Sequence, residues 1–331
     1  MKKVAKIAIA LIACSLLLFA VSCSKSEKGV AKADYPTKAV TVIVPFAPGG
    51  GSDVLTRSMM EYLELPNNQN FVVVNVEGAS GYIGAQQAYN SSNDGYTYLA
   101  HNPMDVVSYT LGGVTTQALY KDLELVCGIA DDFNFLVTNK QTGWKSLDDM
   151  VAYVKAHPGE VKVGNTGSMN SNMAECIRVL RALGIEDMVT IVPYNSGADN
   201  KVACMGNHIQ LSCNTGADIQ SSVVSGDIVP LVVISSRRSK SLEDVPCTQE
   251  LGIDVVTTKP RGLYAPAGVD EAKLQVIKDA IKKVCDNPEY QEKVKSLGLE
   301  VNYVDGEELQ KKIDSWVVEL TPIFEEMKAN N

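Results

Sequence analysis

The sequence predicts an α/β fold with enough chain for two domains. Short apolar runs of strand length alternate with amphipathic helical segments, a pattern typical of sheets covered by helices. The chain has 331 residues, of which 45% are hydrophobic and 21% charged, as in ordinary globular proteins. This length suffices for two domains of normal size. We therefore expect mainly parallel sheets flanked by helices.

The first 22 residues have the layout of an export signal. The apolar run 7–21 follows Lys2, Lys3 and Lys6 and is short for a membrane-spanning helix. Removal of residues 1–22 takes away three lysines and no acidic residue, which changes the formal charge from −9 to −12. A field of this sign repels nucleic acid and does not steer anions. An anionic ligand must therefore be held by local dipoles.

The predicted end of this signal is Cys23. Ala20-Val21-Ser22-Cys23 looks like the lipobox of bacterial lipoproteins, in which the cysteine is acylated and becomes the mature N-terminus. The tetrapeptide that ends at Cys14 fits the first consensus position better, but cleavage there would leave an apolar run on the mature chain. An ordinary secretory peptide is the other alternative. We expect 23–34 to be a lipid-anchored tether that holds the protein to a bilayer, in the periplasm or at the cell surface.

Apolar runs and glycine turns predict the elements of the first hundred residues. They are strands at 40–44, 71–75 and 97–100 and helices at 52–64 and 81–89. Further along, strands and helices alternate again. These strands are 161–164, 190–192, 209–213 and 231–234, and these helices are 146–156, 172–183, 199–205 and 219–225. Ser146 is the expected N-cap of its helix, with acidic residues in the first turn that suit the helix dipole.

The C-terminal part is expected to be mostly helical, over 270–285, 288–297 and 307–328. In the last of these, five apolar residues recur at helical spacing, and we interpret them as a stripe that faces the core: Ile313, Trp316, Val317, Leu320 and Phe324.

Cysteine and histidine usage gives no sign of catalysis or metal binding. Apart from Cys14 in the signal and Cys23 at its end, the other six of the eight cysteines are scattered without a Cys-x-x-Cys pair. Most are expected to be buried thiols, although an exported protein can form disulfides. The three histidines lie far apart, and no Gly-x-Ser-x-Gly elbow is present. Asp131-Asp132 is interpreted as a solvated turn. We expect no enzyme activity, no metal and no cofactor.

The most informative segment is the glycine-rich run 45–53, between a predicted strand and a predicted helix. Glycines let the backbone approach a ligand, and the amides of a helix N-terminus bind anions. Val54 stands where Gly-x-Gly-x-x-Gly requires its third glycine, and no lysine precedes Ser52 as in a P-loop. The segment therefore does not predict a nucleotide site. A plain turn is the alternative.

Several other motifs accompany this segment in a fixed order. They are Tyr35-Pro36-Thr37-Lys38, VPFAPGG at 44–50 with Asp53, VVVNVEGASGYIGA at 72–85, Asp94-Gly95-Tyr96-Thr97, Val192-Pro193-Tyr194 with Gly197, the run 239–246, and Ala265-Pro266-Ala267-Gly268. In this combination the chain resembles the solute receptors of tripartite tricarboxylate transporters, also called the Bug family. The resemblance covers nearly the whole mature chain.

The resemblance implies a two-lobed periplasmic binding protein type II fold, the Venus flytrap. The expected lobe 1 comprises 35–135 and 259–331, and lobe 2 comprises 136–258. The implied activity is capture of a small organic anion (a di- or tricarboxylate or an amino acid) by lobe closure, and delivery to the membrane permease subunits of a tripartite transporter. An extracytoplasmic sensor that passes its closed form to a membrane sensor kinase would have the same sequence. The expected state is a monomer without nucleic-acid partners.

The resemblance also implies ligand-binding residues by position. From lobe 1 these are Pro48, Gly49, Gly50 and Asp53; from the strand-to-helix loops of lobe 2 they are Thr166, Gly167, Ser168, Tyr194, Asn195, Ser196, Gly197, Thr215, Gly216 and Asp218. Each has plain turn chemistry as its alternative.

Three positions depart from the family pattern. Ser171 lies where many relatives have a histidine, and Asn195 replaces the usual lysine. Arg261 stands where an aromatic residue is common. We hypothesise that Arg261 helps to set ligand specificity; a solvated surface arginine is the alternative.

Overall fold

Two β-sheets form the centre of the computed structural model, which describes residues 35–329. Cys23 and the predicted signal and tether lie outside the described residues. The first sheet has six strands in the order β11-β4-β10-β3-β1-β2. Their bounds are β1 Val40–Val44, β2 Phe71–Asn75, β3 Thr97–His101, β4 Leu123–Asp132, β10 Lys259–Pro266 and β11 Glu300–Asp305. The second sheet has five strands in the order β7-β6-β8-β5-β9. Their bounds are β5 Asn134–Asn139, β6 Val161–Thr166, β7 Val189–Tyr194, β8 Leu211–Thr215 and β9 Ile228–Val233.

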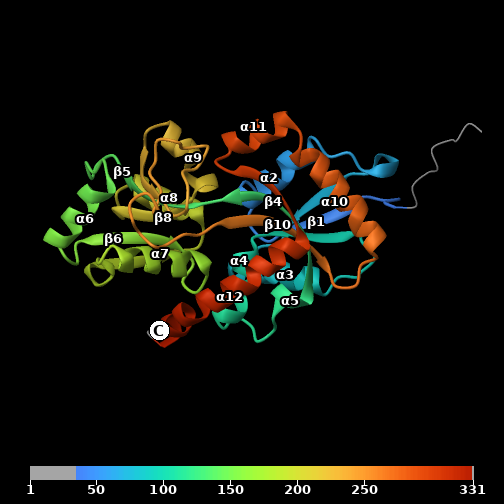
Figure 1. The fold of residues 1–331 in the computed structure, drawn as a ribbon, viewed down its shortest axis with the longest axis horizontal. Coiled ribbons are helices and arrows are strands. Elements are labelled where there is room, and N and C mark those ends of the chain that lie inside the picture. Colours follow the sequence, from blue (N-terminus) through green and yellow to red (C-terminus); the bar gives the residue numbers. More distant parts are fainter. Residues whose placement is uncertain (1–34, 330–331) are drawn as a thin grey trace, which may run out of the picture. The chain divides into compact units, whose positions relative to one another are not determined.

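Each sheet with the helices packed on it is called a lobe below, and Figure 1 shows both. Lobe 1 carries α2 Gly51–Met60, α3 Tyr82–Tyr89, α4 Pro103–Leu111, α5 Leu119–Asp122, α10 Glu271–Cys285, α11 Pro288–Ser296 and α12 Gly306–Ala329. Lobe 2 carries α6 Leu147–Ala156, α7 Ser171–Ala182, α8 Gly197–Met205 and α9 Gly216–Val224. Short 3-10 turns lie at Pro66–Asn68, Ala79–Gly81 and Glu186–Met188.

The two-lobed α/β fold agrees with the expectation, but both sheets are mixed rather than mainly parallel. β1 pairs in parallel with β2 and β3, and β6 pairs in parallel with β7 and β8. The pairs of β10 with β3 and β4, of β4 with β11, and of β5 with β8 and β9 are antiparallel. The chain leaves lobe 1 through β4 and returns through β10, so these two strands must run in opposite directions.

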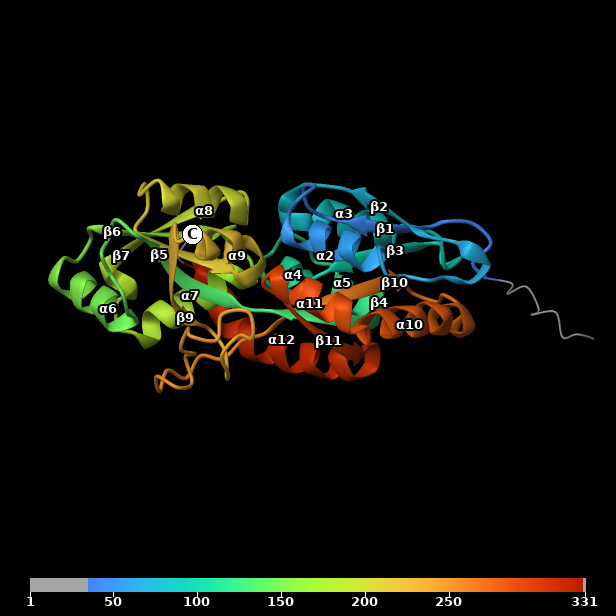
Figure 2. The same cartoon turned by 90° about the horizontal axis from the view of Figure 1, so that it is seen from above.

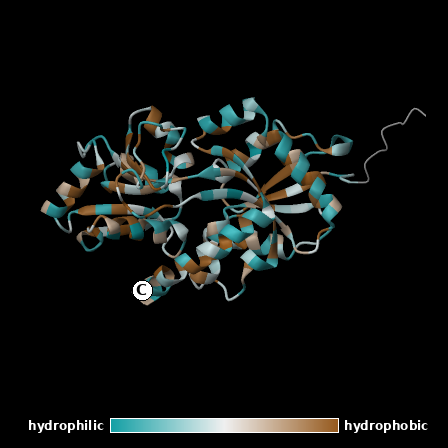
Figure 3. Ribbon diagram, viewed as in Figure 1, coloured by the Kyte–Doolittle hydropathy of each residue, from teal (hydrophilic) through white to brown (hydrophobic). Residues whose placement is uncertain are grey.

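Apolar side chains cover both faces of each sheet, and Figure 3 shows their concentration in the strands. A separate apolar cluster joins the lobes where α4, α7 and α12 meet, through Met104, Met173, Ala174, Leu320, Ile323, Phe324 and Met327. The predicted stripe of the last helix does face the interior, because Ile313, Leu320 and Phe324 are buried. Figure 2 shows α12 extending from lobe 1 to lobe 2, where it overlaps the second sheet at the C-terminal end.

Several local predictions are confirmed. The strands at Val40–Val44 and Phe71–Asn75 have the predicted bounds. Ser146 caps α6 in a capping box with Asp149. The six described cysteines are buried and free. The interpretation of Asp131-Asp132 as a solvated turn is wrong, because both residues lie in β4 and the Asp132 side chain is fully buried.

Candidate ligand-binding site

The glycine loop between β1 and α2 is fastened by Asp53. The buried Asp53 carboxylate accepts hydrogen bonds from the Gly49 amide (2.9 Å), from Arg57 Nε (2.8 Å) and from Asn75 Nδ2 (2.9 Å). Gly49 has a φ of +81°, which only glycine adopts at little cost. Asp53 therefore holds the loop in its shape, and its carboxylate oxygens bind donors of the protein itself.

Burial by itself would raise the pKa of Asp53, but the hydrogen bonds from Arg57, Gly49 and Asn75 outweigh it and hold the pKa below its ordinary value. A carboxyl group with a lowered folded-state pKa stabilises the fold above its unfolded pKa, about 3.9, and that stabilisation is lost as the pH falls through the folded value. We expect Asp53→Asn to lower the unfolding free energy by about 1–3 kcal/mol at pH 7. Urea unfolding at pH 7 and pH 3 should show this difference shrinking at the acid pH; a difference that does not depend on pH would contradict the assignment.

The helices α2 and α9, from different lobes, meet at their N-termini. A Cβ placed on Gly51 would lie 3.0 Å from the Cβ of Ala217. The N-cap residues Gly50 and Thr215 make no side-chain hydrogen bond to the first turns of these helices. The first-turn amides of an α-helix have no intrahelical acceptor, so two uncapped helix N-termini face each other between the lobes.

Neighbouring helices at the same edges of the sheets are capped by their own residues. Asn102 accepts from the Met104 amide at α4, Asn170 from Met173 at α7, and Ser196 from Asp199 at α8. The N-cap of α3, Gly81, makes no side-chain hydrogen bond either, but the uncapped ends of α2 and α9 meet from different lobes, so that one ligand anion could cap both.

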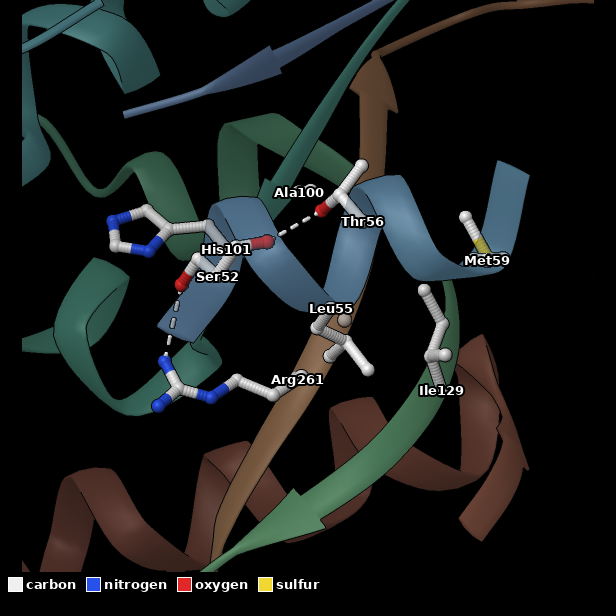
Figure 4. Close-up of a pocket in the computed structure, with 9 residues that line it drawn as sticks. Ser52, Leu55, Thr56, Met59, Ala100, His101, Ile129 and Arg261 are labelled. Atoms are coloured by element: carbon white, nitrogen blue, oxygen red, sulfur yellow. Dashed lines mark hydrogen bonds between the residues drawn. The ribbon is translucent and has the colours of Figure 1, made fainter. Parts of the chain in front are cut away.

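Arg261 reaches from β10 to the start of α2. Its Nη2 lies 2.6 Å from Asp132 Oδ2, and its Nη1 donates to Ser52 Oγ at 3.2 Å, the bond drawn in Figure 4. The Arg261 side chain is 12% exposed and that of Asp132 is fully buried. Among the described residues, Arg261 Nε has no hydrogen-bond partner. The alternative of a solvated surface arginine is therefore wrong.

Asp218, in the first turn of α9, lies against the start of α8. Its Oδ2 accepts a hydrogen bond from Thr215 Oγ1 at 2.9 Å, and a Cβ on Gly197 would lie 2.1 Å from the same oxygen. No side chain larger than that of glycine fits at position 197 with Asp218 in this place. Burial raises the pKa of Asp218, and the neighbouring Asp132 carboxylate raises it further.

A buried polar chain links the lobes close to this region. Ser171 Oγ at the start of α7 donates to Asp105 Oδ1 on α4 at 2.6 Å, and Lys259 Nζ donates to the same Ser171 Oγ at 3.0 Å. Lys259 Nζ also lies 3.2 Å from Glu175 Oε1, with both side chains almost fully buried. Glu175 Oε2 accepts from Asn134 Nδ2, at the start of β5, at 2.5 Å. These bonds connect Lys259 in the crossing strand β10 with Asn134, which begins β5 two residues after the end of β4.

The structure brings together only part of the predicted set. Gly50, Thr215, Gly216 and Asp218 gather around the meeting point of α2 and α9, with Gly197 of α8 beside Asp218, and Arg261 lies on the other side at Ser52. The Gly167 amide donates to the Tyr194 carbonyl at 2.9 Å, so the loops that hold Thr166 and Asn195 adjoin each other. Pro48 and Asn195 are exposed.

Ser168 lies elsewhere. It lines a hollow of about 240 Å³ between α7 and the end of α12, together with Met173, Ile177, Pro193 and Ile323. Nothing in that hollow faces α2. Sequence reasoning missed Ser52, Asp105, Asp132 and Lys259, because their importance depends on partners distant in the chain.

A second and much smaller hollow, of about 10 Å³, lies between α2 and the first sheet (Figure 4). Apolar side chains such as Leu55, Met59 and Ile129 form most of its lining. His101 also lines it, and burial lowers the pKa of His101 to about 4. Its Nδ1 accepts from the Asn102 amide at 2.8 Å and its Nε2 lies 2.5 Å from the Tyr109 hydroxyl. His101 is thus a neutral core residue with both nitrogens engaged.

Within residues 35–329, no group of His, Cys, Asp or Glu is arranged to hold a metal ion. None of the helices in this part of the chain has the length and apolar character that a membrane crossing requires.

Two mixed sheets joined by crossing strands, with helix N-termini from both lobes facing each other, define the class of periplasmic solute-binding proteins. Residues 55–328 match the model of the tripartite tricarboxylate transporter family receptor, and the chain belongs to this family. Protein BugT of Bordetella pertussis is 31% identical over 242 residues, which are 71% of this chain and 73% of that protein.

Two solved structures show the same fold. The structure of R. palustris Rpa4515 with adipate has a TM-score of 0.80 at 23% identity and covers 89% of this chain and 99% of that one. MatC from Rhodopseudomonas palustris, with bound malate, has a TM-score of 0.75 at 22% identity and covers 88% of this chain and 100% of that one. The family and the fold are those of substrate-binding receptors.

Proposed function

We propose that this protein is an extracytoplasmic receptor that captures a small carboxylate by lobe closure and delivers it to the membrane subunits of a tripartite tricarboxylate-type transporter. The observation that carries the proposal is the pair of uncapped N-termini of α2 and α9, which face each other from different lobes. Family membership supports it, as do the relatives whose structures hold malate and adipate.

The mechanism follows from the position of these helices. A carboxylate that binds the amides of Gly51 and Ser52 in the open form presents its second oxygen to the amides of Ala217 and Asp218 when the lobes close. Each helix end contributes a partial positive charge of roughly half a unit, so the bound anion is neutralised without a lysine or arginine clamp. A ligand that contacts both lobes shifts the open–closed equilibrium toward the closed form. This manner of binding suits the acidic chain, which cannot attract anions at long range.

The proposal is tested by a thermal-shift screen of di- and tricarboxylates and amino acids. A ligand that binds only the native state raises the unfolding temperature, and at one hundred times its Kd it adds about 2.7 kcal/mol. We expect at least one carboxylate to do so and its primary amide to fail. If no carboxylate raises the unfolding temperature, the receptor function is wrong.

Arg261 is proposed to tune affinity rather than to clamp the anion, because its guanidinium is already paired with Asp132. Arg261→Lys keeps a charge beside Asp132 but loses the planar fork that reaches Ser52 and Asp132 together. We expect the affinity for the best carboxylate to fall about 3- to 10-fold, or 0.7–1.4 kcal/mol. Calorimetric titration measures the change, and an unaltered affinity in a folded variant would exclude Arg261 from the specificity determinants.

The proposal also includes a lipid anchor that places the receptor near its transporter. Acylation of Cys23 would anchor a monomeric receptor at the membrane surface, where the permease subunits lie. Mass spectrometry of the protein from its native membrane, before and after Cys23→Ser, tests the anchor.

A further inference from the structure

We propose that Asp218 makes the receptor select ligands that carry a cationic nitrogen beside their carboxylate, as amino acids do, over the matching ligands without the amine. This inference rests on the proposed function and names the chemistry of the ligand at the same site. Asp218 would act as a specificity-determining residue, in contact with the ligand ammonium group.

The Asp218 carboxylate occupies a place beside the start of α8. It lies against Gly197, the first residue of α8, where a Cβ would come within 2.1 Å of Oδ2. The position at which a ligand anion would meet the start of α8 is therefore already taken by a negative charge of the protein. Thr215 Oγ1 engages Oδ2 only, which leaves Oδ1 for another donor. A second ligand carboxylate at this place would be repelled, whereas an ammonium group would be bound.

The second argument is the balance of charge around Arg261. The fields of three carboxylates act on its guanidinium, those of Asp132, Asp105 and Asp218, and Asp132 alone already forms the direct ion pair. Lys259 does not alter this balance, because it is paired with the buried Glu175. A third cation, Lys201, also acts on Asp218. With Glu175 counted, the region holds four carboxylates and three cationic side chains, which leaves an excess of one negative charge. A dianionic ligand would add to that excess, and a zwitterion would not.

Donors without an acceptor lie near the Asp218 carboxylate, which favours a ligand that carries both a negative and a positive group. Arg261 Nε is a buried donor without a partner in the described part of the chain, and it requires an acceptor. The uncapped ends of α2 and α9 likewise require an acceptor. The site therefore combines unused donors for one carboxylate with an acidic side chain for one cation, and a compound that bears both groups a few bonds apart satisfies both.

The test compares compounds that differ only in the amine: L-aspartate with succinate, L-glutamate with glutarate, and 4-aminobutyrate with butyrate. Calorimetric titrations are made at pH 7 in the presence of EDTA, which removes any divalent cation that could take the place of the ammonium group. We expect the amine-bearing member of at least one pair to bind ten times more tightly or better. Asp218→Asn should reduce that ratio to about one while its unfolding temperature stays close to that of the parent protein.

The matched control is Asp199→Asn, which removes the same charge from the exposed first turn of the neighbouring helix α8. It should leave the ratio unchanged. Equal or tighter binding of the amine-free member in every pair that binds, or a ratio that survives Asp218→Asn, overturns the inference and leaves the receptor function standing. If no compound of any pair binds and the wider carboxylate screen is also negative, the receptor function fails and the inference fails with it.

Discussion

Replacing Lys259 by methionine is expected to lower the unfolding free energy by about 3–5 kcal/mol, the usual result of leaving one partner of a buried ion pair unpaired. The Lys259 and Glu175 side chains are 1% and 0% exposed, and Nζ lies 3.2 Å from Oε1. Without Lys259, Glu175 keeps hydrogen bonds from Asn134 and Thr257 but no positive charge. Urea unfolding followed by circular dichroism measures the loss.

A second substitution separates the effect of the unpaired charge on stability from the effect of altered packing. In Lys259→Met/Glu175→Gln the uncompensated charge is gone while an acceptor for Asn134 and Thr257 remains, and at least half of the lost stability should return. Lys312→Met is the matched control, since its ion pair with Glu308 is exposed and should contribute under about 1 kcal/mol. Equal losses in Lys259→Met and Lys312→Met would contradict the account of this buried pair.

Gly51→Val is expected to lower ligand affinity about 100-fold or more, equivalent to about 2.7 kcal/mol, with little effect on stability. Even a single Cβ on Gly51 would lie 3.0 Å from the Cβ of Ala217 in the other lobe, and the methyl groups of valine extend further. The substitution therefore keeps α2 and α9 apart and removes the contacts that a ligand gains on closure. Calorimetric titration with a carboxylate found by thermal shift measures the change.

The loss should be relieved by removing the opposing methyl group. Gly51→Ala/Ala217→Gly is expected to bind more tightly than Gly51→Ala, and Ala198→Val, at an exposed position in the first turn of α8, should bind as the parent protein does. Full affinity in a folded Gly51→Val variant would mean that the lobes do not need to meet here for binding.

Elements with a strong local pattern were predictable from the sequence. The run at Val40–Val44 is apolar except for Thr41 and is typical of a buried strand, and the helices α6, α7 and α10 begin after Ser, Asn or Asp caps. The crossing strands β4 and β10 were not located by the sequence pattern, although the family resemblance implies crossing strands and a return strand within 259–331. They carry Asp132, Lys259 and Arg261, which are polar residues that argue against a buried strand until their partners are known. Their ion-pair partners lie far away in the chain: Glu175 is 84 positions from Lys259, and Asp132 is 129 positions from Arg261.

The candidate site was likewise predictable from the sequence only in part. Glycine and hydroxyl residues in strand-to-helix loops pointed to Gly50, Gly197, Thr215 and Gly216, because turn chemistry is local. No local signal distinguishes the uncapped α2 and α9 from the capped α7 and α8, since the difference depends on where each side chain turns. The pairing of Arg261 with Asp132, which changes Arg261 from an anion clamp into part of an ion pair, likewise required the structure.

The central claim is that a ligand carboxylate is held between the N-termini of α2 and α9, and backbone amide NMR tests it most directly. At saturation with a carboxylate identified by thermal shift, we predict large downfield proton shifts for the amides of Gly51 and Ser52 in lobe 1 and of Ala217 and Asp218 in lobe 2. Such shifts accompany new hydrogen bonds to an anion. Saturation that moves the amides of only one of these helix ends, or of neither, would contradict the claim.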